Sequence, residues 1–167
     1  MGLDNIPNQY ACKKQDVAVM SEDGRIDCDA TIESGKCPHN NMKNSDPLIK
    51  DTIIPLGMLG TNCWYRGKYG AYLLEQMKNH IEDFSYDINT LYGDELEDGN
   101  TGLSADECLS ISNEMIAYSE AWVHYVKTNS EVAGNLNKEK DLIDDWSYLA
   151  WWLKFVGQEC DGSISWY

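Results

Sequence analysis

The stretch from Ser104 to Tyr125, SADECLSISNEMIAYSEAWVHY, decides the fold of this chain. It opens with Ser104 and Glu107, the S-x-x-E pattern of a capping box, in which each side chain accepts a backbone N–H at the start of a helix. Apolar residues then recur at alternating spacings of three and four, which predicts a helix with one buried stripe. The stripe consists of Cys108, Ile111, Met115, Tyr118, Trp122 and Tyr125.

The same periodicity predicts two further helices. One covers residues 70–84, and the other covers residues 138–156 with Gly157 as a natural stop. The second half of the last helix is apolar almost all round, so it lies either at the centre of the fold or at a partner surface. The apolar positions are Leu73, Leu74, Met77, Ile81 and Phe84 in the first helix, and Leu142, Trp146, Leu149, Leu153 and Val156 in the last.

The first 62 residues have a different character. They contain all four prolines and three of the six cysteines. The Asp23-Gly24 turn lies between two short stretches, Val17–Met20 and Arg25–Cys28, which we expect to pair as a β-hairpin. Residues 40–47 are expected to be a polar loop.

Taken together, these patterns predict an α+β fold in a single domain over residues 1–167. Residues 63–167 would form a compact three-helix core. Residues 1–62 would be a small, cysteine-containing segment that carries the hairpin and packs against the core. The alternating tail 162–167 adds a further short strand.

The composition limits the classes of partner. The chain has 167 residues and a formal net charge of -15. This excess of acid argues against unaided binding to long nucleic acid or to an anionic membrane, whereas a small anion can still be held by a local pocket. An acidic surface also suits a mimic of nucleic acid, or serves solubility alone. No apolar run approaches the ~20 residues that span a bilayer, and no secretory signal is visible, so we expect a cytoplasmic protein.

A local reversal of this charge occurs in Cys63-Trp64-Tyr65-Arg66-Gly67-Lys68-Tyr69-Gly70. An arginine can fork onto a phosphate, a lysine adds a point charge, and aromatic rings stack on a flat base. The segment also precedes a predicted helix start, where free N–H groups favour anions. The alternative is that the rings belong to the core and the cations pair with nearby acids. The ligand-binding residues of this hypothesis are Trp64, Arg66, Lys68 and Tyr69, with Trp166 and Tyr167 as further contributors.

A second candidate site is formed by Cys12, Cys28, Cys37 and His39, which lie within a short stretch of chain. Three thiolates and one imidazole would make a closed tetrahedral zinc site, and the ion would stabilise a segment with little core of its own. The chain lacks the usual C-x-x-C pair, so a disulfide or free buried thiols remain alternatives.

The acidic stretch Asp94, Glu95, Glu97 and Asp98 could bind calcium or magnesium through its oxygens. It lacks the order of ligands found in an EF-hand. A solvated loop without a bound ion is therefore favoured over a calcium or magnesium site.

Catalytic motifs are missing from the sequence. It contains no G-x-S-x-G, no H-E-x-x-H and no G-x-x-x-x-G-K-[ST] pattern, and only three histidines. These absences favour a protein that binds without catalysing a reaction. Acids and tyrosines from distant positions still permit an enzyme.

The opening Met1-Gly2-Leu3-Asp4, the segment Cys63–Tyr69 and the closing Trp166-Tyr167 together resemble a loose group of small uncharacterised proteins from phages and environmental bacteria. The resemblance implies a viral counter-defence factor in the host cytoplasm, such as one that sequesters a nucleotide signal. Our leading hypothesis is therefore a non-catalytic protein that binds a small anionic, nucleotide-like ligand. The alternatives are an acidic inhibitor or nucleic-acid mimic that occupies a basic protein, and a zinc-stabilised module or metal-dependent enzyme.

Overall fold

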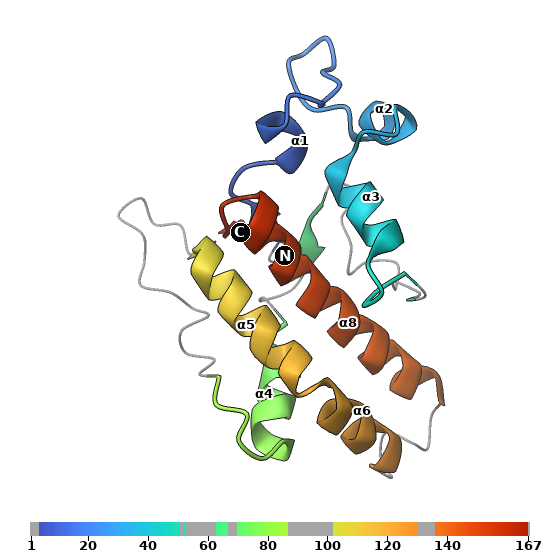
Figure 1. The fold of residues 1–167 in the computed structure, drawn as a ribbon, viewed down its shortest axis with the longest axis vertical. Helices are drawn as coiled ribbons and strands as arrows, with labels where there is room; N and C mark the ends of the chain where they lie inside the picture. Colours follow the sequence, from blue (N-terminus) through green and yellow to red (C-terminus); the bar gives the residue numbers. More distant parts are fainter. Residues whose placement is uncertain are drawn as a thin grey trace.

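A computed structural model describes residues 4–50, 52, 63–66, 70–86, 102–129 and 136–166. Its longest helix, α8 (Leu136–Glu159), runs beside α5 (Ala105–Ala117), and α6 (Ser119–Thr128) continues from α5 (Figure 1). Short strands complete the fold, so the α+β class is confirmed. None of the helices in these ranges is long and apolar enough to cross a bilayer.

The capping box at the start of α5 is confirmed. The Ser104 N–H donates to Glu107 Oε2 at 2.7 Å, and the Glu107 N–H donates to Ser104 Oγ at 3.3 Å. The predicted continuous helix is wrong, however, because it is interrupted at Tyr118. The Tyr118 hydroxyl donates to the Asp83 carbonyl and its ring packs edge-on against Phe84, so tertiary contacts hold the junction.

The other two predicted helices are present with different bounds. The first is α4 (Ala71–His80), which is shorter than expected because the chain turns extended at Ile81. The last, α8, is longer at both ends, and Gly157 lies inside it. A Cβ at Gly157 would approach Leu109 Cγ to 2.7 Å, so this glycine allows α8 and α5 to pack closely. The stop comes later, at Asp161 and Gly162, which both adopt positive φ.

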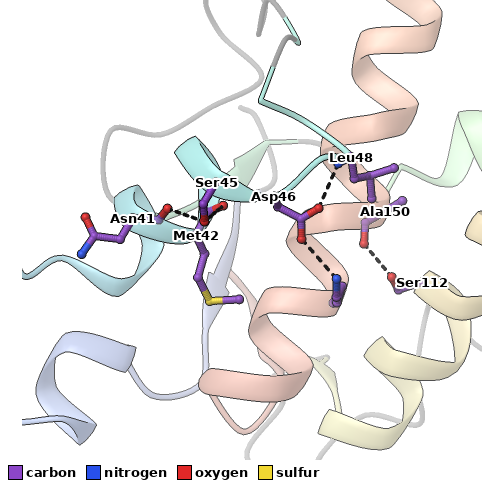
Figure 2. Close-up of polar contacts among 8 residues, drawn as sticks. Asn41, Met42, Ser45, Asp46, Leu48, Ser112 and Ala150 are labelled. Carbon is purple, nitrogen blue, oxygen red and sulfur yellow. Dashed lines mark hydrogen bonds and ion pairs between the residues drawn. The ribbon is translucent and has the colours of Figure 1, made fainter.

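The core lies between α5 and α8. The hydroxyl of Ser112 donates to the carbonyl oxygen of Ala150 at 2.7 Å and links the two helices, as Figure 2 shows. The aromatic second half of α8 is buried. Of the two expected places for this segment, the centre of the fold is therefore correct and an exposed partner surface is not. Its buried rings are Trp146, Tyr148, Trp151, Trp152 and Phe155.

A four-stranded antiparallel sheet joins distant parts of the chain, in the order β2-β1-β4-β3. Its strands are β1 (Asp4–Pro7), β2 (Tyr65–Arg66), β3 (Gly102–Leu103) and β4 (Ser163–Trp166). The tail strand is confirmed as β4, and it lies between β1 and β3. The other three strands were not predicted, because pieces this short carry no periodicity of their own.

The N-terminal segment contains more helix than expected. It forms α1 (Ala11–Lys14), α2 (Cys28–Glu33) and α3 (Pro38–Ser45), which gather near one end of α8 (Figure 1). The predicted polar loop 40–47 is wrong over most of its length, since α3 occupies it. Pro38 at the first helical position presets the backbone for that helix.

The predicted hairpin is reduced to one antiparallel bridge between Met20 and Ile26. The returning strand is wrong beyond this point, because Asp27 is the N-cap of α2 and Cys28 is its first residue. The Asp27 Oδ1 accepts the Ala30 N–H at 2.9 Å and caps the helix.

Candidate functional site

A small cavity lies where the N-terminal segment meets α8. Its volume is about 30 Å³. A cysteine at the start of each of the three N-terminal helices lies in its wall, and a fourth cysteine, Cys63, lies two residues before β2. The lining residues are Tyr10, Ala11, Cys12, Cys28, Ile32, Cys37, Pro38, His39, Cys63 and Phe155.

Helix starts position the three N-terminal cysteines. Cys12 is the second residue of α1, and Cys28 is the first residue of α2, directly after the capping Asp27. Cys37 is the N-cap of α3, directly before Pro38. The structure therefore brings together the three cysteines that the sequence singled out, although they belong to separate elements.

Burial and neighbouring thiols raise the pKa of two of these cysteines, Cys12 and Cys28, and so favour their protonated form. Burial, followed by the neighbouring Cys12 and Cys37 thiols, raises the pKa of Cys28 to about 11. Burial and the Cys37 thiol likewise raise the pKa of Cys12. A bound metal ion would reverse this effect, because a coordinating thiol is deprotonated outright.

His39, the fourth predicted ligand, also lines the cavity. Its ring centroid lies 5.3 Å from that of Trp151 and 5.4 Å from that of Phe155, both on α8. The residue is half-buried, but its Nε2 is enclosed and has no hydrogen-bond partner among the described residues. Burial lowers the pKa of His39 to about 4, so the imidazole is neutral at physiological pH, as a metal ligand must be.

The donors are gathered but not yet convergent. Over the described ranges, no three His, Cys, Asp or Glu side chains are arranged as they stand to hold a metal ion. All six cysteines are free thiols, so none of them forms a disulfide here.

The other predicted site is described only in part. Trp64 is half-buried, and its indole N–H donates to the Tyr10 hydroxyl at 2.6 Å. Arg66 lies in β2, where its backbone pairs with Asp4, and the backbone of Trp166 pairs with Asp4 from the other side. The side chains of Arg66 and Trp166, and the whole of Lys68, Tyr69 and Tyr167, lie outside the described residues. The anionic-ligand site stays a prediction.

The residue that precedes α4 packs closely against α8. Gly70, its N-cap, has a φ of 63°, and a Cβ there would collide with the Leu149 side chain. The Tyr65 hydroxyl would lie 3.2 Å from the same atom. Tyr65 is buried and stacks on Tyr148, which agrees with the alternative that part of this motif belongs to the core. The acidic stretch 94–98 lies outside the described residues.

Sequence reasoning missed Cys63 and Tyr10 as parts of the cavity wall. Cys63 was assigned to the charged aromatic motif, and no local pattern connects it to the N-terminal cysteines. The cysteine composition was the available signal, but a long-range contact was needed to interpret it.

Comparison with known proteins adds no assignment: no protein-family model matches the chain, and neither a curated protein nor a solved structure shows significant similarity to it. The functional argument therefore depends on the geometry and chemistry of the cavity.

Proposed function

We propose that this chain is a non-catalytic binding protein whose N-terminal segment is stabilised by one soft divalent metal ion of the zinc class. The ion would be held by Cys12, Cys28 and Cys37, with a fourth donor from the cavity wall. The observation that carries the proposal is that three cysteines, each at the start of a separate short helix, line the wall of one small cavity.

The size of the cavity favours an ion over a larger ligand. Its volume of about 30 Å³ exceeds the ~10–15 Å³ that a single water needs. Pockets for small organic ligands are about ten times larger, at ~300–1,000 Å³. A nucleotide therefore does not fit in this cavity, whereas a single metal ion does.

The chemistry of the wall favours a soft metal. Thiolates select zinc, copper(I) and related ions, whereas calcium and magnesium prefer oxygen ligands. Without a cation, placing several thiolates side by side in a buried cavity is unfavourable, as the raised pKa values of Cys12 and Cys28 indicate. Metal binding would exchange the thiol protons for the ion.

The local structure explains what the ion would contribute. Helices α1, α2 and α3 contain 4, 6 and 8 residues. Isolated helices shorter than about 12–15 residues are marginal in water. One ion bound by all three would hold these pieces in place, as in small zinc-dependent modules.

Native mass spectrometry of the full, reduced chain tests this proposal, with the denatured mass as reference. We expect a zinc-sized increment that disappears with a chelator, together with loss of helical circular dichroism. Cys12→Ser, Cys28→Ser and Cys37→Ser should each lose the increment. The matched control is Cys108→Ser, because Cys108 is buried on α5 away from the cavity.

A reduced protein that takes up neither Zn²⁺ nor Cd²⁺ would refute the metal site. A nucleotide-sized increment in place of a metal would instead favour the predicted anion site. In that case Arg66→Ala should remove it.

A further inference from the structure

Two cysteines from distant parts of the chain lie at the same end of the sheet. Cys63 lies two residues before β2, and Cys160 lies three residues before β4. Strand β1 lies between β2 and β4 and pairs with both of them in antiparallel register. The chain therefore enters β2 and β4 from the same end of the sheet, the end at Pro7, on either side of β1.

The thiols of these two cysteines are in direct contact, because the Cys63 thiol forms a hydrogen bond with the Cys160 thiol. Backbone contacts anchor both residues. The indole N–H of Trp152 on α8 donates to the Cys63 carbonyl at 3.0 Å, and the N–H of Gln9 donates to the Cys160 carbonyl at 2.9 Å. The two sulfur atoms thus face each other from two fixed positions of the main chain.

The backbone of Cys63 is held in an unusual conformation. Its φ is 64°, in the left-handed region that residues with a Cβ seldom occupy. Such conformations persist where the surroundings enforce them, and they concentrate at functional sites. The hydrogen bond from Trp152 is one contact that enforces it, so α8 helps to direct the Cys63 side chain.

Cys63 is the member of the pair that a small oxidant can reach. It is 7% exposed and lines the cavity, whereas Cys160 is fully buried and is not among the residues of the cavity wall. The cavity volume of about 30 Å³ is roughly two to three times the ~10–15 Å³ that a single water needs. Hydrogen peroxide, which has two oxygen atoms, therefore fits, whereas a bulky disulfide reagent does not.

We propose that Cys63 and Cys160 are a latent disulfide pair, which hydrogen peroxide oxidises through the cavity. The bond would join the segments that enter β2 and β4 across the end of β1. This inference goes beyond the proposed function and does not depend on it, because neither thiol belongs to the three that would hold the ion.

The reaction balances in two steps. The Cys63 sulfur gives up its proton and attacks one oxygen of the peroxide, which breaks the O–O bond and leaves a sulfenic acid and one water. The Cys160 sulfur then attacks this sulfur, loses its proton and expels the hydroxyl group as a second water. Two thiols are oxidised by two electrons to one disulfide, and one peroxide is reduced to two waters.

The environment of Cys63 makes the first step slow. Burial, followed by the hydrogen bond with the Cys160 thiol, raises the pKa of Cys63 well above its ordinary value. The thiolate is the attacking form, and a raised pKa leaves little of it at neutral pH. The pair should therefore respond to sustained oxidant and not to brief exposure.

Peptide mapping by mass spectrometry tests the pair. The full, reduced chain is incubated with hydrogen peroxide, its remaining thiols are alkylated under denaturing conditions, and it is digested without reduction. Oxidation of Met20, whose side chain is exposed, to its sulfoxide confirms that the dose is sufficient. We expect one crosslinked pair of peptides, joined through Cys63 and Cys160. Because this bond closes a long loop, the oxidised chain should unfold at a temperature roughly 5–15 °C higher, and dithiothreitol should reverse the shift.

Cys160→Ala should lose both the crosslink and the shift in unfolding temperature. The matched control is Cys108→Ala, because Cys108 is also fully buried and its Sγ lies 4.0 Å from Ser163 Oγ in β4. This variant should keep the crosslink. If Cys160→Ala fails to fold, the peptide map of the unmodified chain still decides.

A crosslink among Cys12, Cys28 and Cys37, with Cys63 and Cys160 still alkylated, would overturn this inference. Complete conversion of Met20 to its sulfoxide without any crosslink would overturn it as well. Neither result bears on the uptake of a metal ion, so failure of the disulfide pair and failure of the proposed function are distinguishable.

Discussion

The ammonium group of Lys154 on α8 lies 3.1 Å from the Asp46 Oδ2, at the C-terminal end of α3. The other carboxylate oxygen of Asp46 accepts the backbone N–H of Leu48 at 2.9 Å, as Figure 2 shows. Asp46 thus lies at the end of α3, and its side chain orders the turn that follows and ties the N-terminal segment to the central helix. Asp46 is the more buried partner, with 13% of its side chain exposed against 33% for Lys154.

The two partners of this pair should differ in their effect on stability. Lys154→Met removes a partly exposed ion pair and should lower the free energy of unfolding by about 0.5–1 kcal/mol. Asp46→Ala also leaves the Leu48 N–H without its acceptor, so the loss should be about 1–3 kcal/mol. Urea denaturation measures both, with the exposed Lys127→Met as control. Equal losses in the two variants would contradict this role of Asp46.

Gly162 should be among the glycines least tolerant of a side chain. Its φ is 92°, and a Cβ would meet the Leu103 carbonyl oxygen and lie 2.8 Å from the Ser104 carbonyl carbon. Gly35 has a positive φ of 72° as well, but a Cβ there would have no atom within 4 Å. Gly35→Ala therefore measures the cost of the backbone conformation without the cost of a steric clash. We expect Gly35→Ala to cost about 1–2 kcal/mol and Gly162→Ala clearly more. Thermal unfolding gives the comparison, and similar midpoints for the two variants would contradict the contact.

The Ser112 hydroxyl should make a modest contribution to the α5–α8 interface. Ser112→Ala removes its bond to the Ala150 carbonyl and should lower the free energy of unfolding by about 0.5–1.5 kcal/mol. Ser112→Val adds volume to a closed interface and should cost about 1–3 kcal/mol. Asn113→Ala, at the exposed neighbouring position, is the control. If Ser112→Val were as stable as the unmodified chain, the interface would be looser than the structure indicates.

The free energy of unfolding should fall at alkaline pH because of the buried Cys108 thiol. It is fully buried on α5, and burial raises its pKa from the ordinary value of 9.0 to about 12. Because the folded state resists deprotonation, its contribution to stability is complete below about pH 9 and is lost progressively as the pH rises toward 12. Cys108→Ala should therefore show a shallower alkaline decline in the free energy of unfolding. Parallel profiles, measured by denaturation at a series of pH values, would contradict this prediction.

Local patterns predicted the helices of the core well. The capping box at Ser104 and the apolar stripes located α4, α8 and the stretch shared by α5 and α6, which was expected to be one helix, because helical periodicity is repeated within each segment. Their ends were less predictable. Gly157 was expected to stop the last helix, but close packing against α5 gives this glycine a different role.

The N-terminal segment was less predictable because its helices are too short to repeat a helical pattern. Helices α1, α2 and α3 contain too few residues for a strong periodicity. Strands β2 and β3 are recognised as strands only from their pairing with residues far away in sequence. The candidate metal site was predicted in part. Cys12, Cys28 and Cys37 were grouped from their nearness in sequence, whereas Cys63 was assigned to another motif.

The sequence by itself determined the acidic character of the protein, the positions of its main helices and the presence of a cysteine-rich N-terminal segment. These properties depend on composition and on spacings of three and four residues, which are local. Only the tertiary structure decided that Cys63 joins the other cysteines, and that β1 and β4 bring the two ends of the chain together. Both depend on contacts between residues far apart in sequence, which burial and backbone pairing establish only when the whole chain folds.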